Sequence, residues 1–209
     1  MKTKLLILAT LLFAPFTFAQ NAQSILDKAS STFDKAGGVS LSFTLEQKEG
    51  KSTYNQDGTA LIKGNKFKID VPDGITWFDG KTQWVYIKGS DEVNVTNPTG
   101  EELAAISPTV LLNLYKSGFN LSYKGEVKDQ GKAVYKVEMV PQSKKSDISK
   151  FVIHVNKQNS QISSIVIVNK NKTQTSIKIK QYKTGVSLSD STFTFNKKDY
   201  PKVEIIDLR

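Results

Sequence analysis

Apolar and polar residues alternate along much of the chain, which is the pattern of β-strands that bury one face. The clearest case is the stretch from Val39 to Leu45, where every second residue is apolar. Similar runs recur as far as residues 193–195, separated by short turns rich in Gly, Asn, Lys and Ser. This spacing predicts an α+β fold that is mainly antiparallel β, with about ten or eleven strands.

Two segments carry apolar residues at helical spacing instead. The first covers residues 21–36 and is followed by Gly37-Gly38, which ends it. The second is inserted at residues 97–118, where Ser107-Pro108 supplies an N-cap followed by a proline at the first helical position. The apolar positions of these two segments are Ile25, Ala29, Phe33, Leu103, Ile106, Val110, Leu111, Leu114 and Tyr115.

The stretch from Gly74 to Ile87 predicts a hairpin, because Asp79-Gly80 is a strong turn signal between two apolar runs. If its loop has an even number of residues, Ile75 and Trp77 share a face with Trp84 and Tyr86. A surface hairpin would be polar on one side, so this aromatic face needs a cover.

The aromatic face extends further if the preceding turn, Pro72–Gly74, holds three residues and Val71 pairs with Ile75. The wall is then a packed core under the helical segments or the lining of an apolar cavity, and the residues alone leave both open. Its expected members are Leu41, Phe43, Phe67, Ile69, Val71, Ile75, Trp77, Trp84 and Tyr86.

The first residues have the build of a cleaved secretory signal peptide. A short basic start is followed by an apolar run from Leu5 to Phe18, and cleavage is expected after Ala19. We therefore expect a signal peptide at 1–19 and a single domain at 20–209. The sequence has no cysteine, which suits a bacterial periplasm and excludes a lipid anchor on an N-terminal cysteine.

The formal net charge is +9, but its distribution argues against nucleic-acid binding. Arg209 is the only arginine, whereas base and phosphate recognition favours arginine forks. The lysines are spread singly along predicted strands, where they suit solvated faces. A cationic surface of this kind favours anionic lipid headgroups or acidic partners.

No group of residues predicts catalysis or metal binding. His154 is the only histidine and lies in the predicted strand 151–156, where a strand-face role is favoured over a catalytic base or a ligand. One histidine and no cysteine exclude most zinc sites. We expect no enzyme activity, no metal and no cofactor.

Several motifs give the chain a resemblance to the periplasmic lipoprotein carriers of the LolA type. The hairpin motif Asp79-Gly80-Lys81-Thr82-x-Trp84-x-Tyr86 is close to that family's hairpin. The ending Phe193-Thr194-Phe195, with Val203 and Asp207-x-Arg209 after it, is also similar, as are residues 58–69. Ser107-Pro108 followed by Leu111-Leu112 resembles one of the family's lid helices.

The resemblance implies an incomplete antiparallel barrel closed by helices over an apolar cavity. That cavity would hold the acyl chains of lipoproteins. The protein would be a periplasmic carrier of the Gram-negative type that receives lipidated proteins from an inner-membrane ABC transporter and delivers them to an outer-membrane acceptor. A monomer is expected. The alternatives are a lipid- or lipoprotein-sensing regulatory module and a carrier of a different lipid.

The resemblance further assigns the sites. The cavity lining would be the wall described above, with Phe67 at a family cavity position. The lid would use Ile25, Phe33, Leu103, Ile106, Leu111 and Leu114. Better-known members lock the lid with an arginine, but Gly64 stands at that place here and Lys63 precedes it. Lys63 is therefore expected to be a weak lid lock at most, because it offers fewer donors than a guanidinium.

Overall fold

The computed structural model describes residues 14–98, 102–103, 110–112 and 115–209. Helix α1 spans Ala14–Asp34, and two short 3₁₀ helices lie near the C-terminus, η1 at Asp190–Phe193 and η2 at Lys197–Asp199. The strands are β1 (Gly38–Glu49), β2 (Ser52–Lys63), β3 (Lys66–Val71), β4 (Gly74–Phe78), β5 (Gln83–Ile87), β6 (Glu92–Thr96), β7 (Phe119–Asp129), β8 (Lys132–Pro141), β9 (Ile148–Asn156), β10 (Ile162–Asn169), β11 (Gln174–Lys183) and β12 (Glu204–Asp207).

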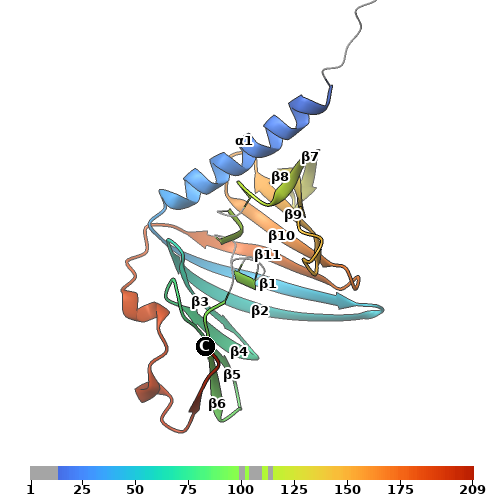
Figure 1. Cartoon of the computed structure of the whole chain (residues 1–209). Helices are drawn as coiled ribbons and strands as arrows, with labels where there is room; N and C mark the ends of the chain where they lie inside the picture. Colours follow the sequence, from blue (N-terminus) through green and yellow to red (C-terminus); the bar gives the residue numbers. More distant parts are fainter. Residues whose placement is uncertain (1–13, 99–101, 104–109, 113–114) are drawn as a thin grey trace, which may run out of the picture.

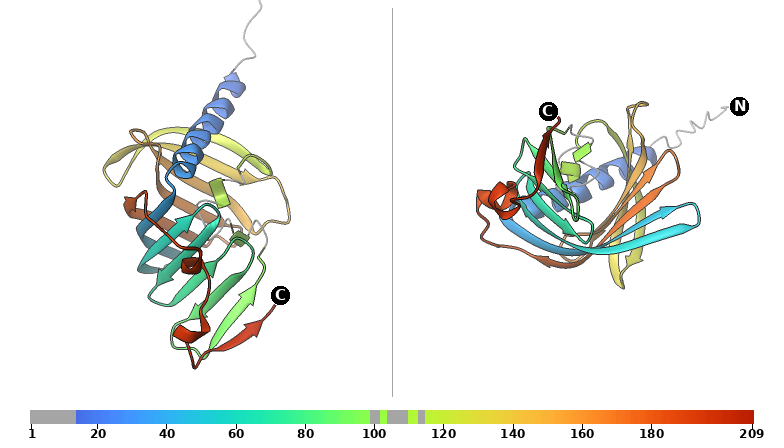
Figure 2. Two further views of the ribbon diagram at one scale, coloured as in Figure 1. Left: turned by 90° about the vertical axis from the view of Figure 1, so that its left-hand side faces the viewer. Right: turned by 90° about the horizontal axis from the view of Figure 1, so that it is seen from below.

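The strands form a single 12-stranded sheet in the order β12-β6-β5-β4-β3-β2-β1-β11-β10-β9-β8-β7. All neighbours are antiparallel except β12, which pairs in parallel with β6. The sheet curves around α1 without closing, since β12 and β7 lie at its two ends (Figures 1 and 2). We call the side that faces α1 the concave face and the other the convex face. The expected open half-barrel is confirmed, with one or two strands more than the ten or eleven predicted.

Helix α1 lies across the concave face and contacts β7 and β9 (Figure 2). Its apolar stripe, which includes Leu26, Ala29 and Phe33, is buried against the sheet. Gly37 follows the helix with φ +68°, a left-handed conformation that favours glycine and ends helices. The N-terminal helix that the spacing predicts is therefore present.

Other expectations fall on residues outside the described ranges. Most of the inserted segment is in this group, including Ile106 and Leu114, so a helical lid remains a prediction. The signal peptide at 1–19, whose residues 14–19 form the start of α1, and the single domain at 20–209 also remain predictions. No helix in the described part of the chain is long and apolar enough to cross a membrane.

The last expected strand, at residues 193–195, is wrong. Phe193 ends the 3₁₀ helix η1, and the chain around it forms no sheet ladder. From Gly185 to Val203 the chain instead crosses the convex face before it joins the sheet edge as β12 (Figure 1). Phe193 and Phe195 are buried or packed on the convex face without being part of a strand. The alternating pattern at residues 193–195 therefore reflects this packing and not strand pairing.

Candidate functional site

The concave face has an apolar floor that runs across the sheet. One row of directly paired side chains crosses six neighbouring strands from β7 to β1 and consists of Tyr123, Val137, Ile153, Ile165, Ile177 and Leu45. All six belong to or pack against the main hydrophobic cluster. Because paired residues project to the same face, the row forms a continuous apolar stripe.

The floor continues onto β2 and β3. Leu41 pairs with Ala60 and Phe43 with Gly58, so a large ring lies opposite a residue without a side chain. A Cβ on Gly58 would come within 2.6 Å of the Phe43 ring and 2.8 Å of Val71. Gly58 therefore makes room for Phe43 on the concave side.

Phe67 is fully buried on the same face and stacks on Phe78 with ring centroids 5.2 Å apart. Together with Leu41, Phe43 and the half-buried Ile69, it belongs to the main cluster. These four expected lining residues are thus brought together beneath the helix, and Val71 packs against the same cluster. Phe67 itself is packed on all sides, so it supports the floor and is closed to solvent.

The other four expected lining residues lie on the convex face, so the expectation of one contiguous wall is wrong. The turn between β3 and β4 holds only Pro72 and Asp73, so Val71 pairs with Gly74 and not with Ile75. A shift of one residue moves every side chain of a strand to the other face. Ile75, Trp77, Trp84 and Tyr86 share the convex face, as the Gly74–Ile87 hairpin predicted, but they are separated from Phe67.

The C-terminal segment covers these convex aromatics. Trp77 is 4% exposed and meets Phe195 edge-on at 5.6 Å and Tyr200 at 5.7 Å. Tyr200 also contacts Tyr86 at 5.1 Å and stacks on Phe195 at 5.3 Å. The hairpin's aromatic face is therefore a small second core, and no helix is needed to cover it.

The concave floor is covered by α1 and by described residues of the inserted segment. Phe33, Leu103 and Leu111 are buried in the main cluster, and Ile25 packs against it half-buried. These four expected lid residues therefore lie over the floor. Val110, Leu112 and Tyr115 join them.

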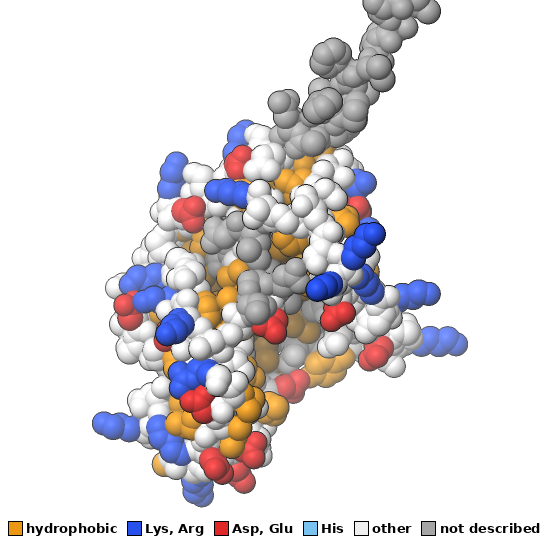
Figure 3. Space-filling view, in the orientation of Figure 1, with side chains coloured by type: hydrophobic (Ala, Val, Ile, Leu, Met, Phe, Trp, Pro, Cys, Tyr) orange, Lys and Arg blue, Asp and Glu red, His pale blue; other side chains and the backbone are white. Residues whose placement is uncertain are grey.

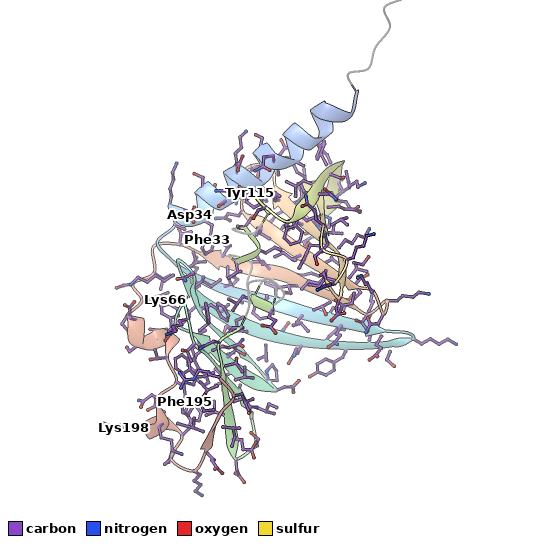
Figure 4. All side chains as sticks on the ribbon, viewed as in Figure 1. Phe33, Asp34, Lys66, Tyr115, Phe195 and Lys198 are labelled. Atoms are coloured by element: carbon purple, nitrogen blue, oxygen red, sulfur yellow. The ribbon has the colours of Figure 1, made fainter. Side chains whose placement is uncertain are left out.

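Tyr115 links the inserted segment to α1 through a short hydrogen bond from its hydroxyl to the carboxylate of Asp27. Figure 4 shows Tyr115 against α1 near Phe33 and Asp34. Burial, followed by the hydrogen bond to Asp27, raises the pKa of Tyr115, so the hydroxyl remains a donor. The apolar pattern of the inserted segment predicted a packed position for Tyr115. It gave no sign that Asp27 on α1 would be the hydrogen-bond partner of Tyr115.

The described residues of the cover leave part of the concave face open. A cavity of about 250 Å³ lies between α1 and the strands β7 to β9. Its lining consists of Ser24, Ile25, Lys28, Tyr123, Tyr135, Val155 and Ser160. Figure 3 shows hydrophobic atoms at the surface of the hollow between the two halves of the sheet. The concave face therefore combines an apolar floor with a partly open polar margin.

Lys63 does not face the concave side. Its ammonium donates to the backbone carbonyl of Leu188 at 2.9 Å and lies 3.6 Å from Asp190. Lys66, labelled in Figure 4, pairs with the same carboxylate at 3.1 Å. These contacts tie the C-terminal segment to the convex side of β2 and β3. Gly64 has φ +60° in the turn that follows, a conformation that favours glycine over an arginine.

His154 lies on the convex face, where Nδ1 is 2.8 Å from the Ser164 hydroxyl. That hydroxyl in turn donates to Asp129 at 2.9 Å, so serine stands between histidine and aspartate. A catalytic triad needs histidine in the middle, and Ser164 is only 3% exposed. Among the described residues, no three His, Cys, Asp or Glu side chains are grouped to hold a metal ion.

Comparison with known proteins agrees with this geometry. Residues 13–172 match the family model described as outer membrane lipoprotein carrier protein LolA. The chain belongs to this LolA family. It is also 26% identical over 194 residues to the uncharacterized protein MJ0687 of Methanocaldococcus jannaschii, covering 91% of this chain and 56% of that protein. The chain thus spans about half the length of this curated relative.

Two solved structures share the fold. An uncharacterized conserved protein from Thermus thermophilus matches with a TM-score of 0.62 and 12% identity, over 90% of this chain and 99% of its own. A domain from Vibrio parahaemolyticus, named for a proposed role in outer-membrane lipoprotein sorting, matches with a TM-score of 0.51 and 11% identity, over 88% and 99%. Because the sequence identities are this low, the two matches establish a shared fold only.

Proposed function

We propose that this LolA-family protein is a periplasmic carrier whose concave face holds the acyl chains of lipoproteins. Cargo would come from an inner-membrane ABC transporter and pass to an outer-membrane acceptor, after export by the signal peptide at 1–19. The observation that carries the proposal is the apolar row from Tyr123 to Leu45, covered by a helix and a short segment and not by a second sheet.

The physical need for such a surface is large. An acyl chain of about sixteen carbons prefers an apolar phase by roughly 12 kcal/mol, at about 0.8 kcal/mol per CH₂. A lipoprotein cannot cross an aqueous compartment with its chains exposed. A curved sheet with a separable cover can shield them and then release them.

The first experiment identifies the ligand. The protein is purified from the producing cells without added detergent, and the bound molecules are determined by native mass spectrometry. We expect triacylated proteins or their lipid moieties. A protein that binds lipoprotein without ever transferring it to acceptor membranes would favour a regulatory module, and other bound lipids would favour a different cargo.

The second experiment locates the ligand. The sequence has no native cysteine, so a single introduced cysteine is the only site that a thiol-reactive fluorophore labels. Single cysteines at Leu45 and Ile69, half-buried on the concave face, are labelled with an environment-sensitive fluorophore. The matched control is Thr59→Cys. Thr59 lies between the concave-facing residues Gly58 and Ala60 on β2, so its exposed side chain projects from the convex face. Acylated peptide should blue-shift the two concave labels and leave the control unchanged. An equal response at Thr59 would contradict binding on the concave face.

A further inference from the structure

One rim of the sheet collects lysines from four turns that are distant in sequence. Strand register brings the turns together: Lys48 pairs with Gln174, Gln174 with Val168, and Val168 with Lys150. The β1–β2 turn, the β10–β11 turn and the β8–β9 loop therefore lie at the same end of neighbouring strands. The residues before β7 join them, since the Gln142 amide donates to the Gly118 carbonyl at 2.8 Å.

This basic rim consists of seven exposed lysines, Lys48, Lys51, Lys116, Lys144, Lys145, Lys170 and Lys172. Three acidic residues lie at the same end of the sheet: Glu49 and Asp147 beside the turns, and Glu46 two positions before Lys48 on β1. Within the described parts of the chain, Lys48 is the one rim lysine with an ion pair, to Glu46 at 3.0 Å. Figure 3 shows lysine side chains projecting on the side where the β1–β2 turn ends in Figure 1.

The opposite rim is arranged differently. There Lys157 pairs with Glu126 at 2.5 Å, and Lys63 and Lys66 share Asp190. Positive charge at that end is partly neutralised within the protein. The excess of positive charge is therefore concentrated at the end of the concave face where Leu45, Phe119 and Ile148 are half-buried.

We propose that the basic rim docks the protein on a membrane surface of anionic phospholipids, with this end of the apolar floor toward the bilayer. Lysines are compact, hydrated charges on flexible stems, which suit a diffuse layer of headgroups. A protein partner with fixed carboxylates would favour arginine forks, and the rim has none. The proposal does not rest on lipoprotein transfer, because vesicle binding is measured without cargo.

The test compares two triple variants of the protein purified from cells, both carrying the same N-terminus so that its contribution cancels. The rim variant is Lys51→Gln, Lys145→Gln and Lys172→Gln. The matched control is Lys35→Gln, Lys132→Gln and Lys183→Gln, three exposed lysines at the opposite end. Circular dichroism checks that both remain folded.

Binding is measured by co-sedimentation with phosphatidylcholine vesicles, with and without phosphatidylglycerol. A lysine near an anionic surface contributes about fivefold, so the rim variant should lose on the order of a hundredfold in affinity for anionic vesicles. The control should retain most of it, because its charges lie beyond the screening length. Added salt should weaken wild-type binding.

Three results would overturn the proposal. One is an equal loss in both triple variants, and another is equal binding to vesicles with and without phosphatidylglycerol. The third is no binding to either vesicle, which would instead favour an acidic protein surface as the partner of the rim.

Discussion

The hydroxyl of Tyr115 donates a hydrogen bond to the carboxylate of Asp27, and this contact joins the inserted segment to helix α1 over the concave floor. Both partners belong to the cover, so the bond holds the cover together without binding it to the sheet. The ring of Tyr115 is 1% exposed, whereas Asp27 lies at the surface. Loss of the bond leaves the carboxylate in water and the ring in place.

Tyr115→Phe should therefore lower the free energy of unfolding by about 1.5–2 kcal/mol, the lower part of the range for a hydrogen bond to a charged group, because Asp27 is exposed. Urea unfolding monitored by tryptophan fluorescence measures this change. Under the proposed function, a looser cover should also speed acyl-chain exchange. Asp27→Asn, which keeps an acceptor oxygen, should have a smaller effect. An unchanged midpoint for Tyr115→Phe would show that the bond contributes nothing to the cover.

Lys63→Ala should leave ligand exchange on the concave face nearly unchanged, because Lys63 contacts Leu188 and Asp190 on the convex side. Exposed ion pairs contribute about 1 kcal/mol or less, so the stability loss should be small. The comparison is Leu111→Ala, which removes a fully buried side chain of the cover and should cost about 2–5 kcal/mol. Fluorescent fatty-acid exchange provides the readout. Abolition of exchange by Lys63→Ala would restore the lysine as a lid lock.

Local signals in the sequence predicted the elements whose geometry is set nearby. Asp79 is an example, because its carboxylate accepts from the backbone amides of Lys81 and Thr82 and fixes a four-residue loop. The shared face of Trp77 and Trp84 follows from that loop. The alternation in β1 likewise predicted the concave positions Leu41 and Phe43.

The wrong half of the predicted wall depended on one turn. Pro72-Asp73-Gly74 is compatible with a two- or a three-residue turn, and the two choices place Trp77 on opposite faces. The cover of that face was also hidden, because Phe195 and Tyr200 reach Trp77 from more than a hundred positions away in sequence. Contacts of this kind depend on the assembled sheet and leave no local pattern.

His154 should make stability depend on pH. Burial lowers the pKa of His154 below its usual value, so the unfolded chain takes up this proton more readily than the native state. The contribution of neutral His154 to the free energy of unfolding is thus fully present above the unfolded-state pKa of about 6.5. This contribution is lost as the pH falls below that value. Urea unfolding of wild type and His154→Gln at several pH values between about 5 and 8 isolates it. The wild type should lose more stability than the variant on acidification, and parallel curves would contradict the assignment.

Gln56 is a polar residue on the apolar floor. It pairs with Leu45, at the end of the row that starts at Tyr123, and its side-chain oxygen is buried without a hydrogen-bond donor among the described residues. A buried polar atom without a partner costs about 1–3 kcal/mol. Gln56→Leu should therefore raise the free energy of unfolding by about 1 kcal/mol in the ligand-free protein.

The matched control is Gln47→Leu, two positions along β1 from Leu45, where the side chain is exposed and little change is expected. Urea unfolding of both variants against wild type decides the point, provided that native mass spectrometry first shows each preparation to be free of lipid. Stabilisation by Gln56→Leu alone would mean that a polar group is kept in the floor at a cost to stability, as expected where a ligand and not a packed core occupies the surface. A loss of stability would instead show that the amide is satisfied in the folded protein and that this end of the floor is ordinary core.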